Sequence, residues 1–500
     1  MLVAANVLLT PGCGDTPPSG AVAGGSTGQG AAESVNSRST VGPESGPVVT
    51  PGDPLAGGAT TGGATTSGAM ADGAMTSGGM TGGGDGRQRV PDGASPVSME
   101  FDAGATDRGI DAPGPALSGV DAGTGDTGPA GGAMDQDAPS AAASPYACDG
   151  PVEQYAATVI SEGGTWTVRR DGTVVTTTSS MLDAMQAGMD SLSPGRRSKQ
   201  AVLVQGSGTI DANARSNIPD YTILNVCGTI DVTGNNTQSD RAPIYARGRN
   251  DIEIPNISVT GSPGYAMFFR DVDNLTLGKV DLRLSDGEGI RIDNHGRADR
   301  SAKVRNITID HVYVSGTGHH GVETYGVDNI KIGTVVARDT TNCGLLLNDT
   351  TNAEVGLVDG EDVATGNGYA VFRLANRAGR INGSYPTNIH VGEVRARRGG
   401  RGIFCVSASG GAVIDRVDIA NTGNHAILVE NCYNVTIASE SGTVAGPGRI
   451  RIAARSEFPT TSDVTFSNLL LNDTAITENP CGSNNRALDI TPMSAVDMCD

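Results

Sequence analysis

An asparagine recurs every 23 residues along much of this chain, each time at the start of a short strand-like run. The clearest members are Asn306 in NITI, Asn329 in NIKI and Asn352 in NAEV, since 329 − 306 = 23 and 352 − 329 = 23. The other members of the column are Asp251, Asn274, Asn388, Asn434 and Asp463. A fixed period of this size is the signature of a solenoid, in which each repeat stacks on the one before it.

Each period contains runs of four or five apolar and β-branched residues bounded by Gly, Asn or Asp, which are typical of short strands. The period is too short for a propeller blade, and no helical pattern competes with the strands. The sequence therefore predicts a parallel β-helix whose coils stack at about 4.8 Å. The gap of 32 between Asn274 and Asn306 indicates an inserted loop around Gly296–Lys303.

The shared position of the asparagines predicts that their amides lie buried at a turn and hydrogen-bond from coil to coil as a ladder. The alternative is that each side chain only satisfies its own turn. Either role is structural, and neither assigns chemistry to these residues.

Composition divides the chain into three parts. Residues 14–145 are dominated by Gly, Ala, Ser, Thr, Asp and Pro, and such a segment buries too little apolar surface to fold, so we expect a disordered tether. Residues 146–500 carry the repeats and predict one elongated β-helix domain. The net charge of −20 argues against nucleic acid and anionic membranes as partners.

The first 13 residues are apolar and end at Cys13, which resembles a bacterial lipoprotein signal with a lipidated cysteine. The alternative is an ordinary export signal. Both predict an extracellular or cell-surface protein, with a lipid anchor at Cys13 in the first case, and we expect a monomer. The sequence contains no run of 18 or more apolar residues, so we expect no transmembrane helix.

Seven further cysteines lack the Cys-x-x-Cys spacing of zinc sites. In an exported protein we expect disulfides between Cys405 and Cys432, one coil apart, and between Cys481 and Cys499 in the tail. Cys148 with Cys227 is a further candidate pair. Cys343 is then the cysteine left over.

Residues 180–192, SMLDAMQAGMDSL, place Met and Leu at helical spacing behind a Ser180 N-cap. We expect this amphipathic helix to cover the open end of the solenoid. The order of helix, then GTID, then coils resembles the pectin lyase-like superfamily of right-handed parallel β-helices, over about residues 157–471. That resemblance implies an all-β, right-handed solenoid with an N-terminal capping helix. The motifs of its polygalacturonase members have no counterpart here, so it transfers no residue role.

Aligning the strands that precede the asparagine turn separates inward from outward positions, because side chains alternate along a strand. The second position is apolar in every coil and is expected to face the core. Its members are Ile244, Met267, Ile290, Val322, Leu345, Val371, Ile403, Ile427 and Ile450. The fourth position is mostly apolar as well, with Thr324 and Arg373 as exceptions.

The third and fifth positions are then expected to point outward. The third holds Tyr245, Phe268, Arg291, Glu323, Leu346, Phe372 and Phe404, and the fifth holds Arg247, Arg270, Asp293, Tyr325 and Asn348. Exposed rings beside fixed charges suit a saccharide groove, because rings stack on sugars and charges bind hydroxyls or carboxylates. We expect Tyr245, Phe268, Tyr325, Arg247, Arg270, Arg291 and Asn348 to bind substrate.

Asp293 and Glu323 fall on neighbouring coils, two residues apart along the strand, which places their backbones about 8 Å apart. Such a spacing suits a glycosidase in which one carboxyl protonates the leaving oxygen and the other activates water. The preceding turns add Asp286, Glu288, His319 and His320 as further candidates, and His320 could relay protons near Glu323. The sequence thus predicts a polysaccharide-degrading hydrolase that requires no cofactor.

Two alternatives remain open. A polysaccharide lyase would use an arginine as the base on a uronate substrate, with Ca²⁺ held by Asp286, Glu288 and Asp293. A non-catalytic glycan-binding or adhesin protein would use the same outward rings without chemistry. All three take a polysaccharide as partner.

Overall fold

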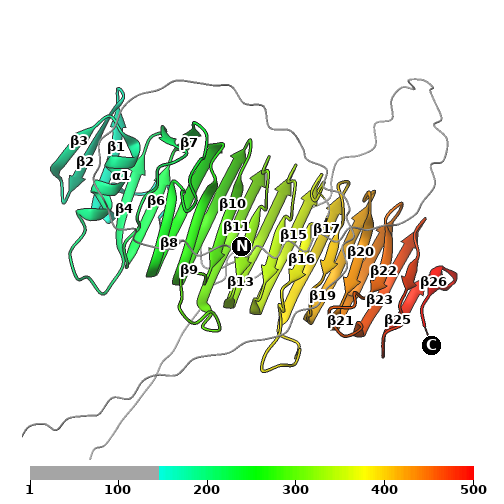
Figure 1. Cartoon of the computed structure of the whole chain (residues 1–500). Helices are drawn as coiled ribbons and strands as arrows, with labels where there is room; N and C mark the ends of the chain where they lie inside the picture. Colours follow the sequence, from blue (N-terminus) through cyan, green and yellow to red (C-terminus); the bar gives the residue numbers. More distant parts are fainter. Residues whose placement is uncertain (1–145, 367, 500) are drawn as a thin grey trace, which may run out of the picture. The chain divides into compact units, whose positions relative to one another are not determined.

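The computed structural model describes residues 146–366 and 368–499, which form one elongated stack of β-coils (Figure 1). The predicted leader, Cys13 and the predicted tether lie outside the described residues. At the N-terminal end, β1 (Ala157–Glu162), β2 (Thr165–Arg170) and β3 (Thr173–Thr178) pair antiparallel. From there on the coils pair parallel, β1 with β4 and then coil with coil, which confirms the predicted parallel β-helix.

Each complete coil contributes to two parallel ladders. The coils begin with β4 (Gln200–Gln205), β5 (Gly208–Asp211), β6 (Thr222–Cys227), β7 (Thr229–Thr233), β8 (Ile244–Gly261) and β9 (Tyr265–Leu284). The first ladder continues with β10 (Glu288–Asp293), β12 (Val322–Tyr325), β14 (Leu345–Asn348), β16 (Phe372–Ala375), β18 (Ile403–Cys405), β20 (His425–Glu430), β22 (Arg449–Ala453), β24 (Ile476–Glu478) and β26 (Val496–Asp497). The second continues with β11 (Val304–Ser315), β13 (Val327–Arg338), β15 (Thr351–Glu361), β17 (Ile389–Arg397), β19 (Ser409–Ala420), β21 (Cys432–Ala445), β23 (Ser462–Asn472) and β25 (Arg486–Thr491).

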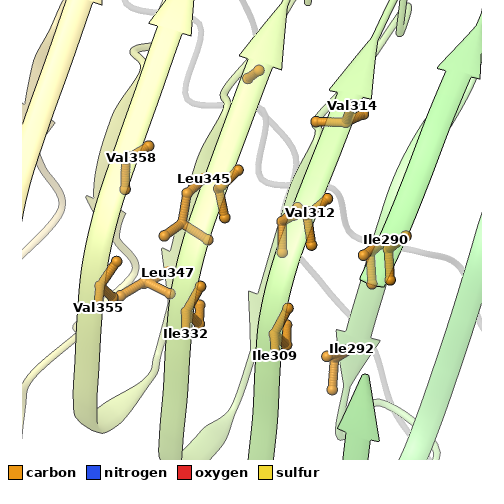
Figure 2. Packing of buried hydrophobic residues seen from close by; sticks show 14 of the residues in the cluster. Ile290, Ile292, Ile309, Val312, Val314, Ile332, Leu345, Leu347, Val355 and Val358 are labelled. Carbon is orange, nitrogen blue, oxygen red and sulfur yellow. The ribbon is translucent and has the colours of Figure 1, made fainter. Parts of the chain in front are cut away.

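The interior of the stack is a continuous aliphatic core. Ile290 and Ile292 of β10 point into the same interior as Val312 and Val314 of β11 (Figure 2). All nine residues expected at the second position are buried, and strand pairing confirms the inward column for all of them except Val371. Thr324 also points inward, where its hydroxyl lies 2.9 Å from the Thr350 hydroxyl, so the buried polar group is paired.

One coil was placed one residue out of register. Leu345 pairs with Phe372, and not with Val371 as expected, so Phe372 lies in the core and Arg373 takes the outward third position. The slip explains why Arg373 seemed to interrupt the fourth position. Because side chains alternate along a strand, an error of one residue exchanges the two faces. Val371 is also buried, just before β16.

The asparagine column is a row of left-handed turns. Asn306 and Asn329 have φ of 61° and 64°, a conformation that Asn adopts more readily than most residues. The Asn329 amide donates to Asn306 Oδ1 at 2.8 Å, and Asn306 donates to Asn274 Oδ1 at 2.9 Å. The predicted ladder is thus confirmed here, although Asn306 and Asn329 are exposed and not buried. It ends at Asn352, which donates to Asp328.

Asn388 stands in register with this column but does not continue the ladder. Its amide is buried and donates to the Gly379 carbonyl at 2.8 Å. Residues 376–388 form a loop between β16 and β17, and this loop changes the turn at which Asn388 lies. The position between Asn388 and Asn434 is Gly411, whose φ is 62°.

The helix α1 (Met181–Asp190) begins at Ser180, whose hydroxyl accepts a hydrogen bond from the Asp183 amide at 3.2 Å. Its buried residues Met181, Met185 and Met189 belong to the same core cluster as the first strands. Short 3₁₀ helices lie at Val152–Gln154 and Met493–Ala495. Among the helices that the structure describes, none has the length and apolar character needed to cross a membrane.

Disulfides join Cys405 to Cys432, Cys481 to Cys499 and Cys148 to Cys227, the three pairs expected from the sequence. Cys343 is a buried free thiol.

The inserted loop expected near Gly296–Lys303 spans residues 294–303, between β10 and β11.

We predict that Asn306→Ala lowers the free energy of unfolding by about 1–2 kcal/mol, because it removes two ladder hydrogen bonds and strains a left-handed residue. Asn306→Gly keeps the left-handed turn and should cost less. Urea unfolding of both variants measures the difference. If both variants lost the same free energy of unfolding, the left-handed backbone conformation would not be the reason for an asparagine at this position.

Candidate functional site

The sequence-predicted site residues gather on the outer side of β9, β10 and β12. Arg291 pairs with Glu323 and Asp293 pairs with Tyr325 across adjacent strands, so the predicted register of the acids is confirmed. Asp293 is fully buried and accepts three charged hydrogen bonds, from Arg270 Nε and Nη2 at 2.8 and 3.0 Å and from Arg291 Nε at 2.8 Å. Burial alone would raise the pKa of Asp293, but the two guanidinium groups lower it to about 2.

Arg291 also bonds the second acid, with Nη1 donating to Glu323 Oε2 at 2.6 Å. Its guanidinium therefore lies between Asp293 and Glu323, where the predicted mechanism placed water and substrate. Asp293 is thus a positioning residue for the arginines, and this geometry disfavours it as the partner acid of Glu323. The other Glu323 oxygen accepts from Asn348 Nδ2 at 2.8 Å.

A different carboxyl group, Glu288, lies against Glu323. Glu288 follows the turn between β9 and β10, and both glutamates are 6% exposed. Burial and the negative charge of Glu323 raise the pKa of Glu288 well above its usual value. Burial would also raise the pKa of Glu323, but the charge of Arg291 and the hydrogen bond with Glu288 lower it. Both directions favour a state in which Glu288 carries a proton beside an ionised Glu323.

Charge balance gives the physical reason for this arrangement. Arg247, Arg270 and Arg291 compensate Asp240, Asp293 and Glu323, so ionisation of Glu288 would leave one uncompensated buried charge. The second oxygen of Glu288, Oε1, is buried and has no hydrogen-bond partner among the described residues. Tyr265 lies beside the pair, and burial followed by the charge of Glu288 raises its pKa to about 12.

His320 is partly buried and lies next to the glutamate pair. Its Nδ1 accepts a hydrogen bond from the Cys343 amide at 3.2 Å, and its ring packs edge-on against Tyr369. Burial lowers the pKa of His320 to about 4, so the ring is neutral at pH 7. Asp286 lies on the exposed turn before Glu288, outside this buried cluster.

The expected row of exposed rings is wrong. Tyr245 and Phe268 are 2% and 0% exposed and pack against each other and Tyr265. Arg270 lies over the Phe268 ring at 4.7 Å. The alternation of side chains along the strand correctly predicted that these rings lie outside the core. It could not predict that neighbouring side chains shield them from the solvent.

The remaining predicted binding residues are unequally accessible. The Arg247 side chain is half exposed and lies 3.7 Å from Asp240, whereas Asn348 is buried. Tyr325 is partly exposed and packs against His295, which the sequence analysis did not single out. This face therefore presents an acid–arginine cluster with few free rings.

The carboxylates proposed to hold Ca²⁺ do not converge. Asp293 is saturated by arginines, Glu288 holds a proton, and Asp286 lies on the exposed turn. Within 146–366 and 368–499, no group of three His, Cys, Asp or Glu side chains is placed to bind a metal ion.

A groove that the sequence analysis missed lies further along the stack. It has a volume of about 580 Å³ and is lined by the loop after β16, the start of β21 and the loop after β22. Its rings are Tyr385, Tyr433 and Phe458, and its cations are Arg377 and Arg380. The available signal was the long gap between Asn352 and Asn388, 388 − 352 = 36, which marks an enlarged loop.

Comparison with protein-family models and with curated proteins finds no match. Among solved structures, the chain is similar to the A-modules of the mannuronan C-5 epimerases AlgE4 and AlgE6 of Azotobacter vinelandii. The identities are 13% and 11%, with TM-scores of 0.31 and 0.25. Both matches cover 64% of this chain and 95% of the other. Similarity at this level assigns no role to any residue of the site.

We predict that Glu288→Gln stabilises the protein increasingly as the pH rises. The pKa of Glu288 is higher in the folded protein than in the unfolded chain. Its contribution to the free energy of unfolding is therefore complete below about pH 4.5 and is lost as the pH rises through the folded-state pKa. Glutamine can still donate to Glu323 but cannot ionise. Urea unfolding at pH 4 and pH 8 should show a gain only at pH 8; Glu354→Gln, on exposed β15, should show none.

His320 should give the opposite pH dependence. The pKa of His320 is about 4 in the folded protein and about 6.5 in the unfolded chain. The contribution of His320 to the free energy of unfolding is therefore complete above pH 6.5 and falls by about 3 kcal/mol as the pH drops to 4. His320→Asn keeps an acceptor for the Cys343 amide and should remove that slope. His390→Asn, at an exposed position of β17, is the control. An unchanged slope in His320→Asn would contradict the assignment.

Proposed function

We propose that the protein is an exported, carbohydrate-active enzyme that hydrolyses a polysaccharide at the glutamate pair Glu288–Glu323. The observation that supports this is the separation of the two pKa values by their surroundings, which leaves one acid protonated beside one carboxylate. Such a pair supplies the general acid and the general base that glycoside hydrolysis needs.

In the proposed reaction, Glu288 transfers its proton to the leaving glycosidic oxygen while Glu323 accepts a proton from the attacking water. The two carboxyl groups are in hydrogen-bond contact, closer than the roughly 5–9.5 Å that separates the acids of glycosidases. The sugar must therefore part the two side chains as it enters. Arg291 holds Glu323 in its ionised form, and Asp293 holds Arg291.

The lyase alternative is less well supported on this face. Its base would be an arginine, but Arg270 and Arg291 each donate two or more hydrogen bonds to carboxylates. Although burial opposes it, these carboxylates raise the pKa of both guanidinium groups above the usual value. A proton-abstracting base needs a lowered pKa. The alternative of a non-catalytic glycan-binding protein finds its support in the groove around Tyr433. This groove carries aromatic rings but no pair of carboxyl groups.

We predict that Glu288→Gln and Glu323→Gln each lower polysaccharide hydrolysis by at least about a hundredfold, because each removes one proton-transfer group. Release of reducing ends from a panel of polysaccharides measures this, and Glu354→Gln is the matched control.

Three outcomes separate the candidate functions. Products that absorb near 235 nm, which carry the unsaturated uronate left by elimination, would indicate a lyase instead, and chelation of Ca²⁺ should then be tried. Binding without release of reducing ends would leave a glycan-binding protein. Full activity in both glutamate variants would place the chemistry elsewhere.

A further inference from the structure

The groove around Tyr433 has the chemistry of an acidic-saccharide site. Tyr385, Tyr433 and Phe458 are each partly exposed, so part of each ring faces the solvent. Tyr385 and Tyr433 lie 4.9 Å apart between centroids and are tilted by 39°. Rings that are half covered in this way can stack on a sugar and lose little conformational freedom on binding.

The two tyrosine rings are held in place by their own hydroxyl groups. Tyr433 donates to the Pro459 carbonyl at 3.0 Å, and Tyr385 donates to the Ala408 carbonyl. Both hydroxyls are therefore used in fixing ring orientation across neighbouring coils. The faces of the rings, and not their polar ends, remain for a ligand.

The cations of the groove are free to bind an anion. Arg377 and Arg380 are exposed, and neither guanidinium forms a salt bridge or hydrogen bond within the part of the chain that the structure describes. This contrasts with Arg270 and Arg291, which are saturated by carboxylates. The one acid of the lining, Asp463, accepts from Ser462 and from Asn484 at 2.6 Å. In a chain of net charge −20, two unpaired arginines beside three rings favour an anionic ligand.

Hydrogen bonds connect this groove to the glutamate pair. Glu323 accepts from Asn348, and Asn348 in turn accepts from Asn376 Nδ2 at 2.9 Å. Asn376 directly precedes Arg377 at the edge of the groove. The strands β12, β14 and β16 are successive in the ladder, so the groove begins two coils, or about 10 Å, from Glu323.

We propose that the groove formed by Tyr385, Tyr433, Phe458, Arg377 and Arg380 binds an acidic polysaccharide, with uronate carboxylates on the arginines and sugar rings on the aromatic side chains. The inference shares with the proposed function only the assumption that the ligand is a saccharide. It does not require the glutamate pair to be catalytic. The polymer would run along the helix axis and present a neighbouring segment to Glu323.

Calorimetric titration of the full chain tests this, with oligogalacturonate as the probe and its carboxyl-reduced form as the neutral counterpart. The oligogalacturonate should bind, the reduced form should bind at least about tenfold more weakly, and added salt should weaken only the charged probe. Tyr433→Ala, and Arg377→Gln combined with Arg380→Gln, should each weaken binding about tenfold. Tyr433→Phe keeps the ring and should retain most of the affinity.

The controls come from a ring–arginine pair elsewhere on the stack. Arg283 lies 4.8 Å over the Tyr313 ring on the second ladder, and Tyr313→Ala and Arg283→Gln should bind like the wild type. The exposed arginine variants keep the test valid if Tyr433→Ala fails to fold.

The outcomes separate this inference from the hydrolase proposal. Absence of binding, equal binding of both probes, or groove variants that bind like the wild type would overturn the inference, whatever the cleavage assay shows. Groove-dependent binding without release of reducing ends would support the inference and remove the hydrolase.

Discussion

Burial of the aliphatic columns inside the stack is the constraint on which the rest of the structure depends. Ile290, Val322 and Leu345 occupy equivalent inward positions on successive strands and are completely buried. Because side chains alternate, this burial fixes which residues leave the core and which outward residues become neighbours. Arg291 and Glu323 meet because Ile290 and Val322 are paired below them.

In the acid–arginine cluster, the outward neighbours on adjacent strands are charged and are largely shielded from water. Removing charges from water is costly unless they are paired, and here two arginines compensate two carboxylates. The third carboxyl group, Glu288, then avoids the cost by keeping its proton. The acid–base role proposed for Glu288 and Glu323 rests on this charge balance, and the same balance argues against proton transfer by Asp293 or Arg291.

The groove around Tyr433 has the opposite character. Its arginines are exposed and unpaired within the described residues, and its two tyrosines are anchored by backbone carbonyls. It lies where the regular repeat is interrupted by the loop of residues 376–388. In a solenoid, long loops between strands are where a repetitive scaffold can acquire a binding surface.

Much of the fold could be predicted because it depends on local pattern. The 23-residue period, the asparagine turns, the inward column and the placement of Asp293 and Glu323 on adjacent coils all follow from short stretches of chain. The errors arose where the pattern was interrupted or where distant groups intervened. A one-residue error in the predicted register at Phe372 exchanged two faces, and the rings of Tyr245 and Phe268 were covered by each other and by Tyr265.

The sequence by itself determined the parallel β-helix and the register of most of its coils, since both follow from the repeat wherever the repeat is regular. Only the tertiary structure decided that Glu288, and not Asp293, lies against Glu323. It also decided that the exposed rings lie around Tyr433. Burial, ion pairing and loop placement depend on groups that are brought together in space, and no local spacing encodes them.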